Sequence, residues 1–176
     1  MTFSKRLLFL IALLTFGVAS ASMAQDKSKR PSPPVEAKAT IEDLTISISY
    51  GSPAVKGRKI WGGLEAYDKV WRTGANEATT IEVNKDVLIN GEKLPAGKYA
   101  LFSIPKEKED WVLIFNKDAK QWGAYNYSEA KDALRINVKT EKTEQLTERL
   151  TFKVDETGTV TFAWEYLTFS FVVKKA

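Results

Sequence analysis

Apolar residues recur at every second position through most of this chain, and this period constrains its fold more than any other feature. Successive side chains of a β-strand point to opposite faces, so the alternation predicts strands with one buried face. Only residues 128–134 have a helical pattern. The sequence therefore predicts an all-β protein, an antiparallel β-sandwich of short strands with one short helical segment. The alternating segments are 44–50, 80–83, 134–138, 150–154, 160–166 and 167–173.

Turn residues divide these segments. Asn90-Gly91 is typical of a two-residue hairpin turn, and residues 94–97 (Leu-Pro-Ala-Gly) predict a second turn before a strand at 98–104. Near the C-terminus the apolar positions change parity between Tyr166 and Leu167. A change of one residue would reverse every following side chain, so a β-bulge or tight corner is predicted there.

The interior is expected to be rich in aromatic residues. Residues 111–115 form a continuous apolar run, which is typical of a central strand buried on both faces. Trp61, Trp111 and Trp164 are predicted to belong to the same core.

Residues 1–24 have the pattern of a cleavable signal peptide. Lys5 and Arg6 precede an apolar run at 7–18, and small residues follow at 19–24. The run is shorter than the roughly 20 residues of a membrane span. The mature chain is therefore predicted to be periplasmic or secreted, without a transmembrane anchor.

The remaining residues are expected to form one domain behind a tether. Residues 25–38 are polar and contain four lysine or arginine residues and the cluster Pro31-Ser32-Pro33-Pro34, so they predict an extended tether. A single β-sandwich domain is predicted over residues 39–176.

Two absent residue types restrict the chemistry. The chain has no cysteine and no histidine, which excludes disulfides, lipid attachment at cysteine, catalytic triads that need either residue, and zinc sites built on them. The 26 basic residues fall to 24 without Lys5 and Arg6, against 22 acidic ones, so the mature net charge is +2. Because the charges are interspersed, no nucleic-acid partner is predicted. No cofactor is predicted either, and no metal site, because the acidic residues lack the spacing of a calcium loop.

Residues 70–79, Val-Trp-Arg-Thr-Gly-Ala-Asn-Glu-Ala-Thr, are the strongest candidate for a polar site. The turn residues can direct the Arg72 guanidinium and the Glu77 carboxylate toward one point, with Asn76 beside them. One interpretation is a ligand-recognition loop. The alternative is an Arg72–Glu77 ion pair that fastens the loop to its own sheet.

Two further segments carry candidate binding residues. Lys56, Arg58 and Lys59 surround Gly57 and can form an anion site with Arg72, or merely a solvated basic loop. Trp122 and Tyr125 lie among amide side chains, a composition suited to sugar binding or to a loop that buries its own aromatic rings.

Three segments resemble a known family. They are residues 56–64 (Lys-Gly-Arg-Lys-Ile-Trp-Gly-Gly-Leu), residues 67–79 with the Trp-Arg-Thr-Gly-Ala-Asn-Glu core, and residues 94–105, which begin Leu-Pro-Ala-Gly-Lys-Tyr. Together they resemble the domain of unknown function 2911 family of exported bacterial proteins. The resemblance implies an exported protein with a domain from about Ala39 to the C-terminus, and it carries over no catalytic residue.

These observations favour a non-catalytic binding or interaction module. Its site is expected around Arg72, Asn76 and Glu77, and its ligand is expected to be a glycan, an organic anion or an envelope protein. One alternative is a histidine-free hydrolase with Glu77 as base and Arg72 stabilising negative charge. The other is a purely structural envelope subunit.

Overall fold

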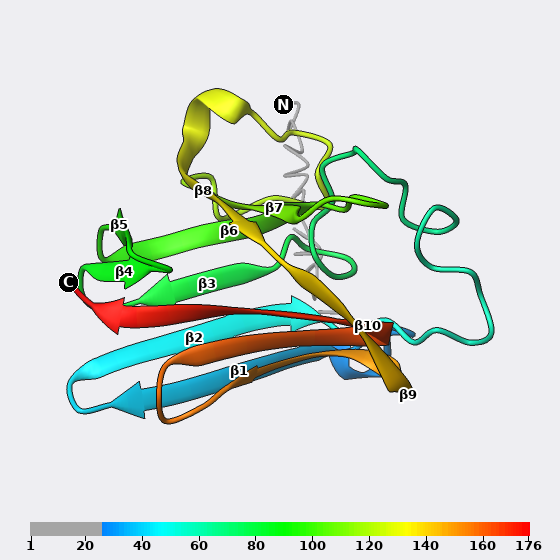
Figure 1. The fold of residues 1–176 in the computed structure, drawn as a ribbon, viewed down its shortest axis with the longest axis horizontal. Coiled ribbons are helices and arrows are strands. Elements are labelled where there is room, and N and C mark those ends of the chain that lie inside the picture. The colour runs from blue at the N-terminus through cyan, green and yellow to red at the C-terminus, as the bar shows by residue number, and fades with distance from the viewer. Residues whose placement is uncertain (1–25) are drawn as a thin grey trace, which may run out of the picture.

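The computed structural model describes residues 26–176, which fold into ten strands in two antiparallel sheets (Figure 1). The predicted antiparallel β-sandwich is confirmed. The six-stranded sheet has the order β1 (Pro34–Ile41), β2 (Leu44–Gly51), β3 (Thr80–Val83), β6 (Gly97–Ile104), β7 (Trp111–Asn116) and β8 (Asp132–Val138). The four-stranded sheet has the order β5 (Glu92–Leu94), β4 (Val87–Ile89), β10 (Thr159–Lys175) and β9 (Thr140–Val154).

The main core lies between the sheets and follows the period-two pattern. In β2, Ile46 and Ile48 are fully buried, whereas Ser49 on the opposite face is exposed. Four tryptophans meet in this core. Trp61 packs edge-on against the other three, with ring centroids 4.7 to 5.7 Å away, and the expectation that Trp61, Trp111 and Trp164 are core residues is confirmed. The fourth tryptophan of this core is Trp71, which belongs to the 70–79 segment.

Strand β10 doubles back on itself at the predicted change of parity. Glu165 has a φ of 58°, and the pairing with β9 shifts register on both sides of it. The two halves of β10 consequently lie together (Figure 1). The rings of Phe162 and Phe169, one from each half, are stacked with 4.5 Å between their centroids. The Thr168 hydroxyl also donates to the Phe162 carbonyl at 2.6 Å. The predicted corner is confirmed, and it keeps the aromatic residues of both halves inside.

A second, smaller core covers part of the outer face of the six-stranded sheet. It consists of Ala78, Ala100, Phe102 and Ile114, and Tyr127 packs edge-on against Phe102 with 5.2 Å between ring centroids. These contacts hold the 70–79 motif and the 117–128 loop over β6 and β7. The outer face of β1, β2 and β3 is left accessible beside them.

The hairpin turn at Asn90-Gly91 is confirmed, since both residues have positive φ and Ile89 pairs with Glu92 across them. Residues 111–115 also lie in the interior strand β7, as expected. The helical expectation for residues 128–134 is right only for a 3₁₀ turn, η2 (Glu129–Lys131), because Asp132 already pairs with Asn116 in β8.

Two other expectations need correction. Strands β9 and β10 have 15 and 17 residues, so not all strands are short. The tether expected over 25–38 is wrong in its second half, because β1 begins at Pro34 and pairs along its whole length with β2. Its first half includes a 3₁₀ turn, η1 (Lys27–Lys29), that contacts the domain. The predicted signal peptide, 1–24, lies outside the described residues.

Candidate functional site

The 70–79 motif precedes β3 and extends the six-stranded sheet past the amino-terminal end of that strand. Trp71 exchanges two backbone hydrogen bonds with Ser103 of β6, at 2.8 and 2.9 Å, and the Leu101 amide donates to the Thr79 carbonyl at 2.7 Å. Between these points the chain forms a tight turn. Thr73 is fully buried with a φ of 51°, and its hydroxyl donates to the Ser103 hydroxyl at 3.0 Å. The buried hydroxyls therefore fix the turn to the sheet.

Two glycines allow this turn to approach β2. A Cβ on Gly51 would collide with the backbone carbonyl of Ala75, and a Cβ on Gly74 would lie 2.7 Å from the Thr79 hydroxyl. The Ala75 amide donates to the Gly51 carbonyl at 3.2 Å. The close approach aims the following residues, Asn76 and Glu77, over the outer face of the sheet.

The polar side chains of the motif do not pair as expected. Arg72 Nε donates to the Gly74 carbonyl at 3.1 Å, so the arginine caps its own turn. Glu77 instead binds two cations of the amino-terminal arm, which we define as residues 26–33. Lys27 Nζ lies 2.9 Å from one carboxylate oxygen and Arg30 Nη1 lies 2.8 Å from the other. The predicted Arg72–Glu77 ion pair is therefore wrong.

A cleft of about 910 Å³ lies beside Glu77 on the outer face of the six-stranded sheet. Its floor includes Glu36, Ser49 and Thr80, which are neighbours across β1, β2 and β3. Its walls come from the arm, from the 76–78 part of the motif and from the 119–122 loop. We call this hollow the outer cleft. It joins the carboxylates of Glu36 and Glu77, hydroxyls and an exposed indole with the basic side chains of Lys27, Arg30, Lys98 and Lys120 in one concave surface.

Trp122 is placed next to Glu77 by backbone pairing between the motif and the loop. The Ala78 amide donates to the Gln121 carbonyl and the Gly123 amide to the Asn76 carbonyl, both at 3.0 Å. The Trp122 residue stays 53% exposed, although aromatic side chains of this size are usually buried. The Arg30 guanidinium carbon lies 5.8 Å from the centre of its ring, within the range of a cation–π contact.

A polar network anchors the loop that carries Trp122. Asn116 is fully buried, and its Nδ2 donates to the Ser128 carbonyl and to Asp132 at 2.9 and 2.7 Å. The Tyr127 hydroxyl donates to Asp132 and accepts from Arg135. Burial, helped by the Asp132 contact, raises the pKa of Tyr127 to about 12, so its hydroxyl keeps its proton. This network is structural and makes the Trp122 loop a fixed wall.

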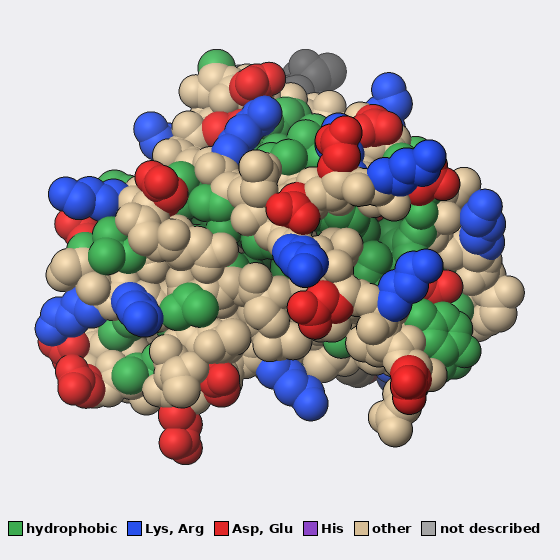
Figure 2. All heavy atoms as spheres, viewed as in Figure 1, with side chains coloured by type: hydrophobic (Ala, Val, Ile, Leu, Met, Phe, Trp, Pro, Cys, Tyr) green, Lys and Arg blue, Asp and Glu red, His purple; other side chains and the backbone are tan. Residues whose placement is uncertain are grey.

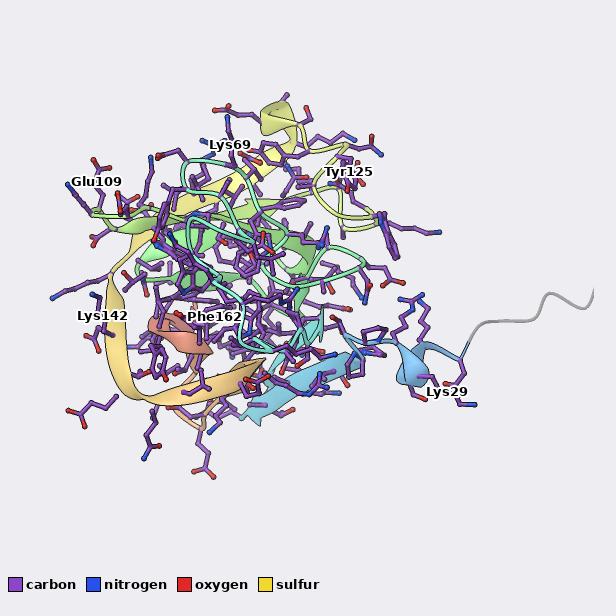
Figure 3. The ribbon with its side chains drawn as sticks, turned by 90° about the vertical axis from the view of Figure 1, so that its right-hand side faces the viewer. Lys29, Lys69, Glu109, Tyr125, Lys142 and Phe162 are labelled. Carbon is purple, nitrogen blue, oxygen red and sulfur yellow. The ribbon has the colours of Figure 1, made fainter. Side chains whose placement is uncertain are left out.

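Five of the predicted site residues lie away from the outer cleft. The Lys56–Lys59 loop folds onto β9, where the Lys56 amide donates to Glu148 and Arg58 donates to the Ala54 and Val55 carbonyls. The outer cleft is lined by Asn76, Glu77 and Trp122, but not by Lys56, Arg58, Lys59, Arg72 or Tyr125. Tyr125 is 82% exposed on the same side of the molecule as Lys29 (Figure 3). The expected anion site of Lys56, Arg58, Lys59 and Arg72 does not line this cleft.

The charge state of Glu77 is set by its partners. Burial raises the pKa of the Glu77 carboxyl, but hydrogen bonds from Lys27, from its own backbone and from Arg30 outweigh it and hold the pKa below 4.5. Glu77 is thus an anion at neutral pH. Its two ion pairs contribute to stability above pH 4.5 and are lost as the pH falls through the lowered pKa.

Glu65 is a polar feature that lies outside the predicted binding residues. It lies beside Trp61, with which it forms an isolated bridge, and near Arg58 and Arg72. Burial raises the pKa of Glu65 to about 7, although the two arginines partly oppose this shift. The indole N–H of neighbouring Trp71 lacks a hydrogen bond of good geometry. The burial of Glu65 could not be predicted from the sequence, because it depends on how the 54–65 loop folds against the indole cluster.

Glu65→Gln is expected to change the pH dependence of stability. A carboxyl whose folded pKa lies above its unfolded value loses stabilising free energy as the pH rises from 4.5 to about 7. The variant lacks this loss, so its free energy of unfolding should gain on wild type by about 1–2 kcal/mol across that range, after allowance for partial exposure. Urea unfolding at pH 4, 5.5, 7 and 8 measures it. Glu92→Gln on the exposed hairpin is the matched control, and a difference that does not vary with pH would contradict the expectation.

Two other kinds of feature, a membrane-spanning helix and a metal-ion site, were looked for in the described residues. Within residues 26–176, no helix is long and apolar enough to cross a membrane, and no group of three or more His, Cys, Asp or Glu side chains is placed to hold a metal ion. Figure 2 shows basic and acidic side chains interspersed over the face in view.

The fold and the outer cleft define a class, an antiparallel β-sandwich with a polar cleft on one outer sheet face. A family model described as "Protein of unknown function (DUF2911)" matches residues 32–173, and the chain belongs to this family, which confirms the resemblance. No curated protein and no solved structure matches the chain. The matched region includes Glu77 and Trp122, whereas Lys27 and Arg30 lie outside it.

Proposed function

We propose that the chain is an exported, non-catalytic binding module whose outer cleft takes ligands with ammonium or guanidinium groups. One observation carries the proposal: Glu77 uses both carboxylate oxygens to bind cations, at 2.9 and 2.8 Å, while the exposed Trp122 ring faces the second cation. A carboxylate beside an aromatic face is the combination that favours organic cations. The apolar h-region and small-residue cleavage pattern at residues 7–24 support export.

The arrangement gives less support to the other ligands and functions. Arg58 and Arg72 donate to backbone carbonyls elsewhere, so an organic anion would have to bind Lys98 or Lys120 of the cleft, and Lys98 already pairs with Glu82. A hydrolase with Glu77 as general base needs a raised pKa, whereas the pKa of Glu77 is lowered and Arg72 does not pair with it. A neutral glycan would use the Trp122 face and the amides of Asn76 and Gln121, without requiring the Glu77 charge.

Titration calorimetry of mature protein, residues 25–176, with tetra-arginine tests the proposal. We expect saturable binding that weakens about tenfold in Glu77→Gln and also weakens in Trp122→Ala, because each substitution removes one half of the cation site. The binding should weaken as salt is raised.

The matched control is Glu92→Gln, which removes the same charge from the distant β4–β5 hairpin. Equal weakening in Glu92→Gln and Glu77→Gln would mean that tetra-arginine responds only to net charge, which contradicts the proposal. Neutral chitohexaose is the comparison ligand. Binding of chitohexaose that depends on Trp122 but is unchanged in Glu77→Gln would replace the cation site with a glycan site.

Export has its own test. Expression of the full chain in a bacterium, followed by cell fractionation and N-terminal sequencing, should recover a periplasmic or secreted protein that begins near Gln25. Recovery of the uncleaved chain in the cytoplasm would contradict this part of the proposal.

A further inference from the structure

The outer cleft is already occupied by a basic segment of the same chain. Lys27 and Arg30 bind the two oxygens of Glu77, Arg30 lies over Trp122, and Asn76 Nδ2 donates to the Ser32 carbonyl at 2.9 Å. From these contacts we infer that the amino-terminal arm is a built-in competitor, which lowers the affinity of the cleft for an external basic segment. This inference rests on the proposed function, since it concerns regulation of the same site.

The arm is attached in a way that permits release. No residue of its 3₁₀ turn η1 is buried, and the hydrogen bonds of that turn's backbone lie within the arm. The Lys27 side chain is 59% exposed even while it pairs with Glu77. The Arg30 side chain is more covered, at 18% exposed, so it makes the firmer of the two contacts. Exposed ion pairs are weak and screened by salt, and no arm residue belongs to either hydrophobic core, so the arm can leave without disturbing them.

The arm has a firm point of attachment where it joins the sheet. The Ser52 amide donates to the Pro33 carbonyl at 2.9 Å, and β1 pairing begins at Pro34. Residues 26–32 can therefore detach up to Pro33 while β1 stays paired. Release would free the Glu77 carboxylate and the Trp122 ring together, because both hold the same arm residue, Arg30.

The boundary of the family match falls between the arm cations and the residues that bind them. The match begins at residue 32, so the cations of the arm lie outside the region that defines the family, while the carboxylate and the indole lie inside. A tethered competitor acts at a high effective concentration. The apparent affinity of the cleft for an external ligand is then its intrinsic affinity multiplied by the fraction of molecules whose arm is released. An external segment with lysine and arginine would have to displace it.

The test compares mature wild-type protein with the double variant Lys27→Ser/Arg30→Ser by titration with tetra-arginine. We expect the double variant to bind about tenfold more tightly, because the competing cations are gone. The matched control is Lys29→Ser, which removes an arm cation whose partner within residues 26–176 is Asp26 and not Glu77. Equal affinity in wild type and the double variant overturns this inference alone. Binding by neither protein overturns the proposed function as well.

A second measurement follows the arm without any ligand. Trypsin cleavage after Lys27 and Lys29 should be several-fold slower in wild type than in Glu77→Gln, because docking shields the arm. Acrylamide should quench Trp122 emission more strongly in the double variant than in wild type, since Trp122 is the exposed tryptophan of the described residues. Unchanged cleavage together with unchanged quenching would show that the arm is not docked, and would overturn the inference whatever the titration gives.

Discussion

Trp164→Ala is expected to lower the free energy of unfolding by about 3–5 kcal/mol, a large part of the stability of a typical domain. Trp164 is fully buried, stacks on Trp71 with 5.9 Å between centroids and meets Trp61 edge-on at 5.6 Å. Alanine would leave a cavity between the two sheets that these fixed rings cannot fill. Urea unfolding followed by circular dichroism measures the loss.

Two further substitutions make this expectation specific. Trp164→Phe should cost clearly less, because it keeps an aromatic ring and removes an indole N–H that has no hydrogen-bond partner in the described structure. Trp122→Ala, at the exposed tryptophan of the outer cleft, should change stability by only about 0.5 kcal/mol. Equal losses at positions 164 and 122 would contradict the described core.

Gly51→Ala is expected to lower the free energy of unfolding by about 1–3 kcal/mol and to displace the 74–76 turn. The added methyl would collide with the Ala75 carbonyl, which lies against Gly51 in the ordered turn. Because Asn76 and Glu77 follow that turn, tetra-arginine binding should weaken as well. Thermal melts and calorimetry of the same preparation measure both effects.

Ser49→Ala is the control for the glycine substitution. It lies two residues away on β2 with an exposed side chain, so its stability should stay within about 0.5 kcal/mol of wild type. A Gly51→Ala protein with wild-type stability would mean that the motif does not need its close approach to β2.

Local patterns in the sequence account for most of the fold. The alternation marks the strands because each has a face toward the main core, and the change of parity at Tyr166–Leu167 marks the corner of β10. The lengths of β9 and β10 were not evident, because a strand that bends sharply carries the same signals as two shorter strands. The start of β1 was missed because its proline, Pro34, and its lysine, Lys38, resemble a tether, although an edge strand tolerates both.

The site was only partly predictable. Residues 70–79 were identified as a shaped turn, and Asn76, Glu77 and Trp122 do line the outer cleft. The partners of Glu77 lie 47 and 50 residues earlier, in a segment whose composition favours an extended chain. Pairing over such separations depends on strand order and register, which a single sequence does not reveal. Glu36, Ser49 and Thr80 were missed for the same reason, because only the register of β1, β2 and β3 brings them together.

The fold-back of β10 has a consequence for when the protein can fold. Its first half pairs with the end of β9, its second half lies between β9 and β4, and it supplies Trp164, Phe169 and Phe171 to the core. A ribosome makes residues 159–175 after every strand they join, so the four-stranded sheet cannot close before these residues have been made. Contacts this distant in sequence also form slowly. The main core therefore stays incomplete, with its apolar face open on one side, until residues 159–175 have been made, even if the six-stranded sheet has formed by then.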